Sequence, residues 1–321
     1  MEQKKPLIVL TGPTAVGKTG LSIRLAKAVG GEIISADSMQ VYKHMDIGSA
    51  KIKREEMDGV THHLIDILEP SEPFHVVTFQ RLCRQAMEQI YANGRIPILT
   101  GGTGFYIQAV LYDIDFTEKE EDTAYRDMLE ALAQKDGPQY LHDMLQKVDK
   151  KAADAIHPNN IKRVIRALEF NKQTGLYISE HNETERQKKS AYASVYFVLN
   201  DDRQRLYERI EKRVDDMLAK GLVQEVERLK AMGCTKDMVS MQGLGYKEIL
   251  CFLDGECSLE EAVYRIKRDT RHFAKRQITW FKREKNVIWV NKQDFDYDED
   301  AILKFMEQKI KETTGIGDVA T

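Results

Sequence analysis

The sequence lacks the cysteine spacing of a disulfide framework or a zinc site. No C-x-x-C pair occurs among its four cysteines, Cys83, Cys234, Cys251 and Cys257, which fits reduced thiols in an intracellular protein. No apolar run reaches the roughly 18 residues of a membrane-spanning helix. Lys4-Lys5 and the apolar residues after them faintly resemble a signal peptide, but a glycine-rich segment cuts this run short without a cleavage site. We therefore expect a cytoplasmic protein.

The chain also has little net charge, no internal repeat and no low-complexity segment. Its 48 basic and 51 acidic residues give a formal charge of −3, which argues against indiscriminate nucleic-acid binding. With 42% hydrophobic and 31% charged residues, the composition is that of a globular protein with an adequate core. The 321 residues can form one large α/β domain with an insertion, or two modest domains. No coiled-coil seam is visible, which favours a monomer without an obligate protein partner.

One segment carries a strong positive signal. The run Gly12-Pro13-Thr14-Ala15-Val16-Gly17-Lys18-Thr19 follows an apolar strand pattern at 6–10 and precedes an amphipathic helix pattern, which is the context of a phosphate-binding loop. Its glycines let backbone N–H groups close around phosphate oxygens, and the helix N-terminus and Lys18 add positive charge. The Thr19 hydroxyl suits Mg²⁺. The loop alone does not identify the polyphosphate, and ATP is the usual occupant.

The first third of the chain alternates between strand and helix patterns. Strands are predicted at 6–10, 32–36, 64–68 and 95–100, with a helix over 77–91. Short links between such elements predict a parallel sheet wound with helices, a P-loop NTPase-like (kinase-like) α/β fold. Ligands of such sheets bind beyond the carboxyl ends of the strands. Asp37 and the turn at 101–104 should therefore lie along the same edge as the phosphate loop.

The pattern changes around residue 115. We predict a first core part at 1–114, an all-helical insertion at 115–192, a second core part at 193–312 and a disordered tail at 313–321. The second core part should contain strands at 193–199 and 287–290. It should also contain a helix over 202–220, capped by Asp201 or Asp202, and a basic helix over 259–285.

Asp37 and a group of arginines are candidates for chemistry. Asp37 at a strand end can act as a general base, hold Mg²⁺ or cap a turn. Arg203, Arg209 and Arg213 can reach the phosphates, but their spacing alone favours ion pairs with acids of the same helix. His62-His63 has no companion ligands at metal spacing, which favours a structural role.

Two basic segments suggest a large anionic partner. Residues 264–285 contain nine Lys/Arg against two acids, with a predicted cationic face and buried stripe. The face comprises Lys267, Arg271, Lys275 and Lys282, and the stripe comprises Ile266, Phe273, Trp280 and Phe281. A solvated helix surface is equally compatible with this segment by itself. The second cluster, Lys162, Arg163 and Arg166 in the insertion, favours a phosphate backbone as the partner.

Six runs in this order make the chain resemble the bacterial tRNA dimethylallyltransferases, up to about residue 290. They are Gly-Pro-Thr-Ala-Val-Gly-Lys-Thr (12–19), Ser-Ala-Asp-Ser-Met-Gln-Val-Tyr (35–42), His-His-Leu-Ile-Asp (62–66), Gly-Gly-Thr-Gly-Phe-Tyr (101–106), Gly-Leu-Gly-Tyr-Lys-Glu (243–248) and Ala-Lys-Arg-Gln-Ile-Thr-Trp (274–280). The phosphate loop is shared with many families, whereas the 35–42 and 274–280 runs are much more specific. The cysteine spacing leads us to expect no zinc-finger extension like that of the eukaryotic relatives.

The resemblance implies prenyl transfer rather than phosphoryl transfer. That family moves a dimethylallyl group from dimethylallyl diphosphate to N6 of the adenosine just 3′ to the anticodon, at tRNA position 37. Lys18, the backbone amides of 14–19, Mg²⁺ near Thr19, and Arg203 and Arg209 would stabilise the leaving diphosphate. Asp37 would take the N6 proton.

By the same resemblance, the adenosine is flipped out of the anticodon stack into a channel. The implied tRNA contacts are Asp37, Ser38, Met39, Gln40, Thr103, Arg126, Lys162, Arg163, Arg166, Gln242, Gly245, Tyr246 and Lys247. Two alternatives remain from the residues: a P-loop kinase for a nucleoside or other small molecule, and a nucleotide-switched RNA-binding protein. The kinase has no obvious use for two basic patches, and the switch would need γ-phosphate-sensing loops that we do not find.

Overall fold

The computed structural model describes residues 4–116 and 123–314, which fall into two compact units. We call residues 4–113 with 190–314 the core unit, and the remaining described residues, from 114 to 189, the insertion unit. Part of the tail that was predicted to be disordered, 315–321, lies outside the described residues. No helix in the described part of the chain is long and apolar enough to cross a membrane.

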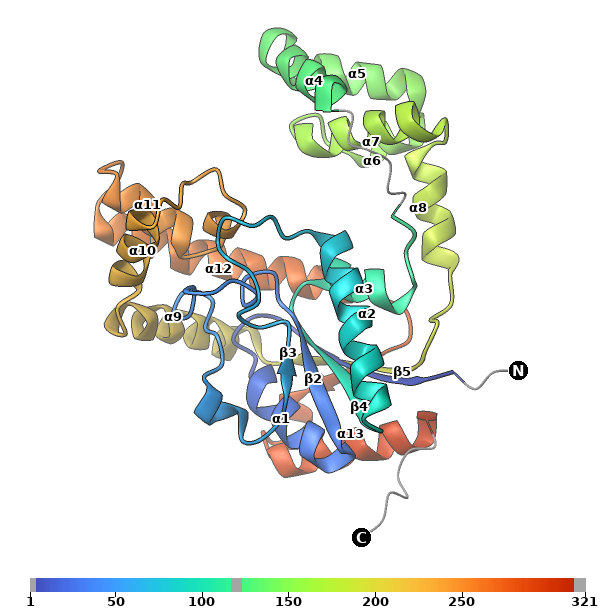
Figure 1. Cartoon of the computed structure of the whole chain (residues 1–321), viewed down its shortest axis with the longest axis vertical. Helices are drawn as coiled ribbons and strands as arrows, with labels where there is room; N and C mark the ends of the chain where they lie inside the picture. The colour runs from blue at the N-terminus through green and yellow to red at the C-terminus, as the bar shows by residue number, and fades with distance from the viewer. Residues whose placement is uncertain (1–3, 117–122, 315–321) are drawn as a thin grey trace. The chain divides into compact units, whose positions relative to one another are not determined.

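The core unit is built on a parallel six-stranded sheet with the order β3-β2-β4-β1-β5-β6 (Figure 1). The strands are β1 (Pro6–Thr11), β2 (Gly31–Ala36), β3 (His62–His63), β4 (Ile96–Gly101), β5 (Ala193–Asn200) and β6 (Val287–Asn291). The order places β1, which leads into the phosphate loop, in the middle of the sheet. The predicted P-loop-like α/β fold is confirmed.

Each central strand is buried on both faces, as a parallel sheet requires. In β1, Leu7 and Val9 point into one apolar cluster, and Ile8 and Leu10 point into the other. Helices α2 (Val76–Ala92) and α3 (Gly104–Leu111) cover the first face, whereas α1 (Lys18–Val29) and α13 (Glu299–Thr314) cover the second (Figure 1). Helix α13 was not predicted, although Ile302, Met306 and Ile310 recur at helical spacing.

The predicted strand at 64–68 is wrong. Pairing with β2 is limited to His62 and His63, which lie beside Ile33 and Ile34. Leu64 and Asp66 then adopt left-handed backbone angles, with φ of 62° and 55°, so the chain leaves the sheet. Periodicity detected the apolar residues here but not this change of direction.

The core unit contains four further α-helices: α9 (Arg203–Ala219), α10 (Leu222–Ala231), α11 (Tyr246–Leu253) and α12 (Leu259–Phe281). Asp202 is the cap of α9, since its carboxylate accepts hydrogen bonds from Gln204 N and Arg205 N at 2.8 and 3.2 Å. Helix α12 ends four residues before the predicted 285. Short 3₁₀ turns lie at Arg54–Met57, Ser240–Gln242 and Lys292–Phe295.

The insertion unit contains α4 (Thr123–Asp136), α5 (Pro138–Val148), α6 (Lys150–Ala155), α7 (Ile161–Thr174) and α8 (Ile178–Gln187). Its helices enclose an apolar cluster of their own, which includes Leu129, Leu141, Leu145 and Val164. Asp149 joins two of them, because its carboxylate caps α6 at Ala152 N and also accepts from Ser179 N in α8, both at 3.0 Å.

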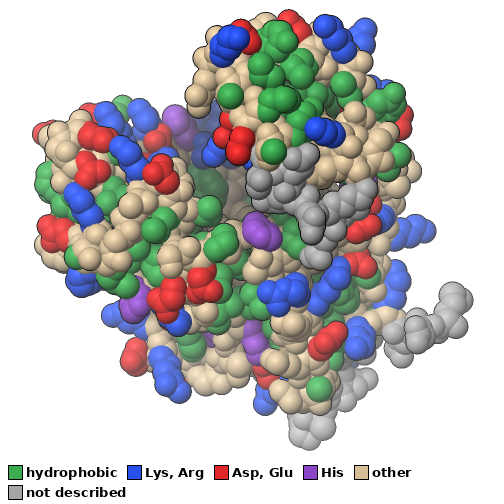
Figure 2. Space-filling model, turned by 45° about the horizontal axis from the view of Figure 1, so that its top comes forward, with side chains coloured by type: hydrophobic (Ala, Val, Ile, Leu, Met, Phe, Trp, Pro, Cys, Tyr) green, Lys and Arg blue, Asp and Glu red, His purple; other side chains and the backbone are tan. Residues whose placement is uncertain are grey.

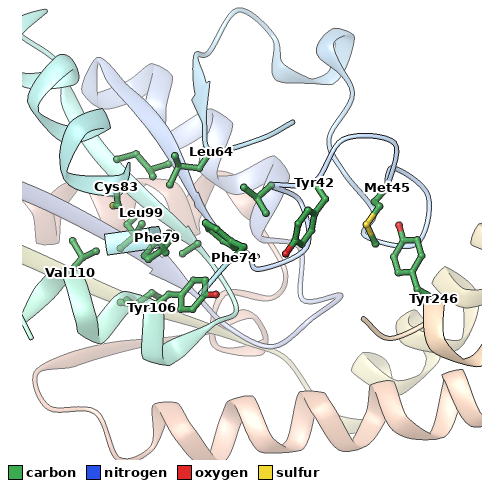
Figure 3. Close-up of a cluster of buried hydrophobic side chains, with 14 of the residues drawn as sticks. Tyr42, Met45, Leu64, Phe74, Phe79, Cys83, Leu99, Tyr106, Val110 and Tyr246 are labelled. Carbon is green, nitrogen blue, oxygen red and sulfur yellow. The ribbon is translucent and has the colours of Figure 1, made fainter. Parts of the chain in front are cut away.

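An aromatic cluster packs beneath the strand ends of the core unit (Figure 3). Phe79 stacks on Tyr106 with ring centroids 4.5 Å apart, and Phe74 meets both rings edge-on. The same apolar cluster extends to Met45 and Tyr246. The cluster includes Val41 and Tyr42, so it anchors the part of the 35–42 run that follows β2.

A buried carboxylate holds the loop at 46–49. Glu225 of α10 is 1% exposed and accepts hydrogen bonds from the backbone N–H groups of Asp46, Ile47 and Gly48 at 2.8–3.0 Å. The Tyr246 hydroxyl donates to the same carboxylate at 2.8 Å and accepts from Ser49 N. The network therefore ties α10, α11 and this loop together.

We expect Glu225→Ala to lower the free energy of unfolding by about 3 kcal/mol or more, because it leaves three partly buried N–H groups and the buried Tyr246 hydroxyl without this partner. Urea denaturation measures the change. Glu227→Ala, at an exposed position of the same helix, is the matched control and should cost under about 0.5 kcal/mol. Equal losses for the two variants would contradict the anchoring role of Glu225.

Candidate active site

The phosphate loop connects β1 to α1 and needs glycine at two positions. Gly12 has φ 149°, and a Cβ there would overlap the Leu199 carbonyl at the end of β5. Gly17 caps α1 in the left-handed region with φ 99°. Both conformations are strained for other residues, so the G-x-x-x-x-G spacing follows from the backbone path.

Lys18 lies folded over the loop. Its Nζ donates to the carbonyl oxygens of Gly12 and Pro13 at 2.9 and 2.8 Å. Burial, with the neighbouring positive charge of Arg213, lowers its pKa to about 7, and the negative charge of Asp37 opposes this shift. A second anion at the loop would therefore favour the charged form of Lys18.

Asp37 and Arg213 complete a cluster of charges around Lys18. Burial lowers the pKa of Arg213, to which the positive charge of Arg209 adds, while Asp37 acts in the opposite direction. The Asp37 carboxylate also accepts a hydrogen bond from Met39 N at 2.8 Å. Asp37 thus caps a turn and also interacts with two cations. The structural role as a turn cap and a chemical role at the phosphate loop are therefore compatible.

The three candidate arginines of α9 differ in position. Arg209 lies against the loop, since a Cβ on Gly17 would be 3.2 Å from its Nη2. Arg213 lies deeper, within the charge cluster. Arg203 instead donates to the Tyr207 hydroxyl at 3.2 Å and stacks on that ring. The role of Arg203 on the diphosphate stays a prediction. Arg213 was a candidate from the sequence, but the residues that the resemblance implied for the diphosphate did not include it.

Gln277 of α12 joins the loop to the turn after β4. Its Oε1 accepts from Thr14 N at 2.8 Å, and its Nε2 donates to Gly102 O at 3.0 Å. Gly102 and Gly104 lie so close to Gln277 and Trp280 that a Cβ at either position would overlap these side chains. Sequence reasoning missed Gln277 as a link, although it lies in the specific 274–280 run. The backbone amides of residues 14–19 were predicted to bind the diphosphate. The Thr14 amide instead donates to Gln277, so it is not part of that set in this structure.

Residues near the two tRNA-associated runs meet in the core unit. The Met39 side chain packs on Gly243. A Cβ on Gly243 would lie 2.5 Å from the Met39 methyl group and overlap it. Ser38 and Thr103 are partly exposed, and Gln40 accepts from the Ser35 hydroxyl at 3.2 Å. This arrangement brings the 35–42 run beside the 243–248 run.

The implied tRNA contacts between positions 242 and 247 have different surroundings. Gln242 is exposed, Gly245 has φ 95°, and Lys247 is partly exposed with Glu248 3.4 Å away. Tyr246 is 0% exposed and packs beside Met45 (Figure 3). Its side chain has no surface for tRNA, so the expectation of a side-chain contact is corrected to a structural role.

The charges of α12 are partly neutralised within the core unit. Lys267 pairs with Asp215 and Arg271 with Glu211 of α9, each at 2.6 Å, so two of the four predicted face residues are engaged. Lys275 and Lys282 are exposed. In the predicted buried stripe, Ala274 rather than Phe273 enters the core. Figure 2 shows both signs of charge interspersed over the visible surface.

The insertion unit carries the second basic cluster on α7. Lys162, Arg163 and Arg166 are exposed, while Val164 and Ile165 between them are buried. Arg126 of α4 holds Glu169 through two hydrogen bonds of 2.9 and 3.0 Å. Arg126 therefore has a structural partner within the unit, and its contact with tRNA stays a prediction.

The described residues contain no group of three or more His, Cys, Asp or Glu side chains placed to hold a metal ion. His62 is bonded to Val60 O at 2.9 Å and His63 to Glu32 at 2.7 Å. Thr19 lines a cavity of about 30 Å³ whose other walls are both polar and apolar: Ser22, Ser35, Gln40, His62 and Thr100, and Ile33, Ile52 and Ile65. Oxygen donors of this kind suit a hard cation that keeps water and substrate oxygens as further ligands.

Comparison with known proteins decides the family. Residues 40–284 match the family model described as IPP transferase, and residues 5–71 match the one described as isopentenyl transferase. The chain belongs to the IPP transferase family. A curated IPP transferase relative, the tRNA dimethylallyltransferase of Lachnoclostridium phytofermentans, is 61% identical over 303 residues, which cover 94% of this chain and 97% of the relative. The resemblance inferred from the six sequence runs is confirmed.

Solved structures of IPP transferase relatives agree. The tRNA isopentenylpyrophosphate transferase of Bacillus halodurans is 47% identical, with a TM-score of 0.73 over 98% of this chain and 99% of the other. The Staphylococcus epidermidis enzyme is 41% identical, with a TM-score of 0.71 over 96% and 100%. A eukaryotic dimethylallyltransferase acting on tRNA is 30% identical, with a TM-score of 0.83 over 98% and 81%. These names describe transferases acting on tRNA and give no support to the kinase alternative.

Without diphosphate, we expect Lys18 to titrate near pH 7 rather than 10.5, because burial and Arg213 penalise its charged form. Bound diphosphate should raise this pKa above about 9. At a pH between the free and bound pKa values, Lys18 takes up a proton when diphosphate binds. The affinity for diphosphate should therefore fall as the pH rises above 7. The measurement is ¹³C NMR of lysine Cε resonances, with Lys18 assigned from Lys18→Arg. A ligand-free midpoint above about 10 would contradict the buried setting.

We expect Gln277→Met to weaken binding of inorganic diphosphate about tenfold, because the loop loses a hydrogen-bonded support worth about 1.4 kcal/mol. Titration calorimetry measures the affinity. The matched control is Gln80→Met, which removes a buried amide that donates to Ala109 O at 2.6 Å on α3. The control should keep the affinity of the wild type. Unchanged or tighter binding by Gln277→Met would show that the link does not shape the loop.

Proposed function

We propose that this IPP transferase moves the dimethylallyl group of dimethylallyl diphosphate to N6 of the adenosine just 3′ to the anticodon in tRNA. The single observation that carries the proposal is the charge cluster at the phosphate loop, where the negative charge of Asp37 acts on both Lys18 and Arg213. This cluster combines cations that can bind a diphosphate with a carboxylate that can accept a proton. Dimethylallyl transfer to tRNA is also the activity for which the matched relatives are named.

The cations stabilise the leaving group. The allylic C–O bond breaks with positive charge developing on carbon, and its electron pair leaves with the diphosphate oxygen. Lys18, Arg209 and Arg213 are held in place by the fold before the reaction, so they need little reorganisation as the charge develops. Arg203, at the exposed start of α9, would reach the same anion only by leaving Tyr207.

Asp37 acts as the base. Adenine N6 is a poor nucleophile because its lone pair is delocalised into the ring, so its proton must leave as the C–N bond forms. The hydrogen bond from Met39 N fixes the Asp37 carboxylate at the end of β2, and this preorganises it for general-base catalysis.

A divalent metal fits this chemistry, as prenyl transferases commonly use one, and we propose Mg²⁺. The Thr19 hydroxyl would hold it together with diphosphate oxygens and water. When bound, the ion would neutralise part of the charge on the leaving diphosphate. Lys18 and Arg209 would bind the oxygens that the metal leaves free.

The tRNA contacts fall on both units. On the core unit we propose Ser38, Met39, Gln40, Thr103, Gln242 and Lys247, and we leave out Gly245, which is buried as Tyr246 is. On the insertion unit we propose Arg126, Lys162, Arg163 and Arg166. The exposed cations of α7 would bind phosphates, which position the RNA without reading its sequence. Because tRNA is the substrate, we place the enzyme in the cytoplasm.

One assay separates this function from the alternatives. The protein is incubated with Mg²⁺, unmodified tRNA carrying an adenosine 3′ to the anticodon, and labelled dimethylallyl diphosphate. Label should appear in the tRNA and be lost when that adenosine is changed to guanosine. No label in tRNA over a range of pH and metal concentrations would refute the proposal. Turnover of ATP with a small acceptor would establish a kinase instead.

We expect Asp37→Asn to lower kcat about 10²-fold or more with tRNA affinity nearly unchanged, because the amide keeps the bond from Met39 N but cannot take a proton. Asp37→Ala removes both functions and should be at least as slow. Single-turnover kinetics and filter binding measure rate and affinity. Asp58→Asn, at an exposed acid, is the control. Lost affinity with an intact rate would exclude Asp37 as the base.

A further inference from the structure

Lys292 is a buried lysine that the proposed mechanism does not use. It follows β6 directly and begins the 3₁₀ turn Lys292–Phe295, with 6% of its surface exposed. Strand β6 pairs in parallel with β5, which pairs with β1. The carboxyl end of β6 therefore lies on the same edge of the sheet as the phosphate loop.

The Lys292 ammonium reaches that loop. A Cβ on Gly17 would lie 3.5 Å from Lys292 Nζ and 3.2 Å from Arg209 Nη2. Gly17 is the N-cap of α1, where backbone N–H groups also present positive charge. Two side-chain cations and a helix N-terminus thus converge on one glycine of the loop.

The acids near these cations do not account for the burial of Lys292. Glu299 Oε1 lies 3.5 Å from Lys292 Nζ, but that side chain is 46% exposed and also lies 3.6 Å from Arg24. Asp201 Oδ2 lies 3.9 Å from Arg209 Nη1, and among the described residues this buried oxygen has no hydrogen-bond partner.

An ion pair with a half-exposed partner contributes little stability, about 0–1 kcal/mol. The cost of burying an ammonium is several kcal/mol. The like charge of Arg209, whose side chain is 44% exposed, does not offset this cost. A purely structural lysine that pins α13 through Glu299 would therefore be replaceable by an apolar side chain. A dianionic or trianionic ligand at Gly17 removes the imbalance, because it interacts favourably with both cations at once.

We propose that Lys292 binds the diphosphate of the substrate and stabilises it as the leaving group, alongside Arg209. This inference rests on the proposed function for the identity of the ligand. Its ammonium donates N–H hydrogen bonds to diphosphate oxygens from the β6 side of the loop, whereas Lys18 reaches them from the loop itself. As the C–O bond breaks and the electron pair moves to the diphosphate, the charge-assisted bonds to Lys292 strengthen.

The test titrates inorganic diphosphate with Mg²⁺ into Lys292→Met and Lys292→Arg, without tRNA. Lys292→Met should bind diphosphate at least about tenfold more weakly, whereas Lys292→Arg should stay within about threefold of the wild type. In the transfer assay, kcat/KM for dimethylallyl diphosphate should fall about 10- to 100-fold for Lys292→Met, with KM for tRNA unchanged. Lys304→Met, at an exposed lysine of α13, is the matched control and should change neither value.

Glu299→Gln separates the two roles of Lys292. If Lys292 binds the ligand, removing the carboxylate frees the ammonium, and diphosphate should bind as tightly as to the wild type or more tightly. If Lys292 serves only to hold α13, Glu299→Gln should weaken binding as Lys292→Met does. This variant also decides the question should Lys292→Met fail to fold.

The outcomes distinguish this inference from the proposed function. Wild-type transfer to tRNA, combined with undiminished diphosphate binding by a folded Lys292→Met, would overturn the role of Lys292 alone. No transfer by the wild type would refute the proposed function, while a loss of diphosphate affinity in Lys292→Met would still support the anion site.

Discussion

The structure depends on assembling like charges around one glycine loop. Lys18, Arg209 and Arg213 are brought together from the first and ninth helices, and the first and last of these are buried enough for their pKa values to fall. Such a cluster is unfavourable until an anion neutralises it. Asp37 is the neighbouring anion in the protein itself, and its charge opposes both shifts. A residue suited to accept a proton is thereby held next to the cations suited to bind a leaving diphosphate.

Close backbone approach explains why the specific sequence runs occur together. The turn at 101–104 has no room for side chains at Gly102 and Gly104, because Gln277 and Trp280 of α12 fill that space. Gln277 in turn holds the Thr14 amide. The glycine-rich turn, the phosphate loop and the 274–280 run are therefore three parts of one packing arrangement, although about 260 residues separate Thr14 from Gln277.

The sequence could predict what local patterns encode. The loop spacing, the strand alternation and the place of Asp37 at a strand end all follow from short segments. It could not show that Leu64 turns the chain out of the sheet, that Tyr246 is fully buried, or that Arg213 rather than Arg203 lies within the charge cluster. Those facts depend on contacts between segments far apart in the chain. Lys292 is the clearest case, since nothing around it resembles a binding motif.

The pairing of charges on α12 restricts where an RNA phosphate can dock on the core unit. Lys267 and Arg271 are held by acids of α9, so a phosphate would have to displace an ion pair to reach them. Lys275 and Arg276 near the other end of the helix are exposed, as are Lys282 and Arg283 just beyond it. That end also carries Gln277 and Trp280, which contact the loop and the turn. At 100° per residue, Lys275 and Lys282 project from the side of this segment that is turned away from Gln277 and Trp280. Under the proposed function, these two lysines can therefore bind an RNA phosphate without disturbing the contacts that Gln277 makes with the phosphate loop.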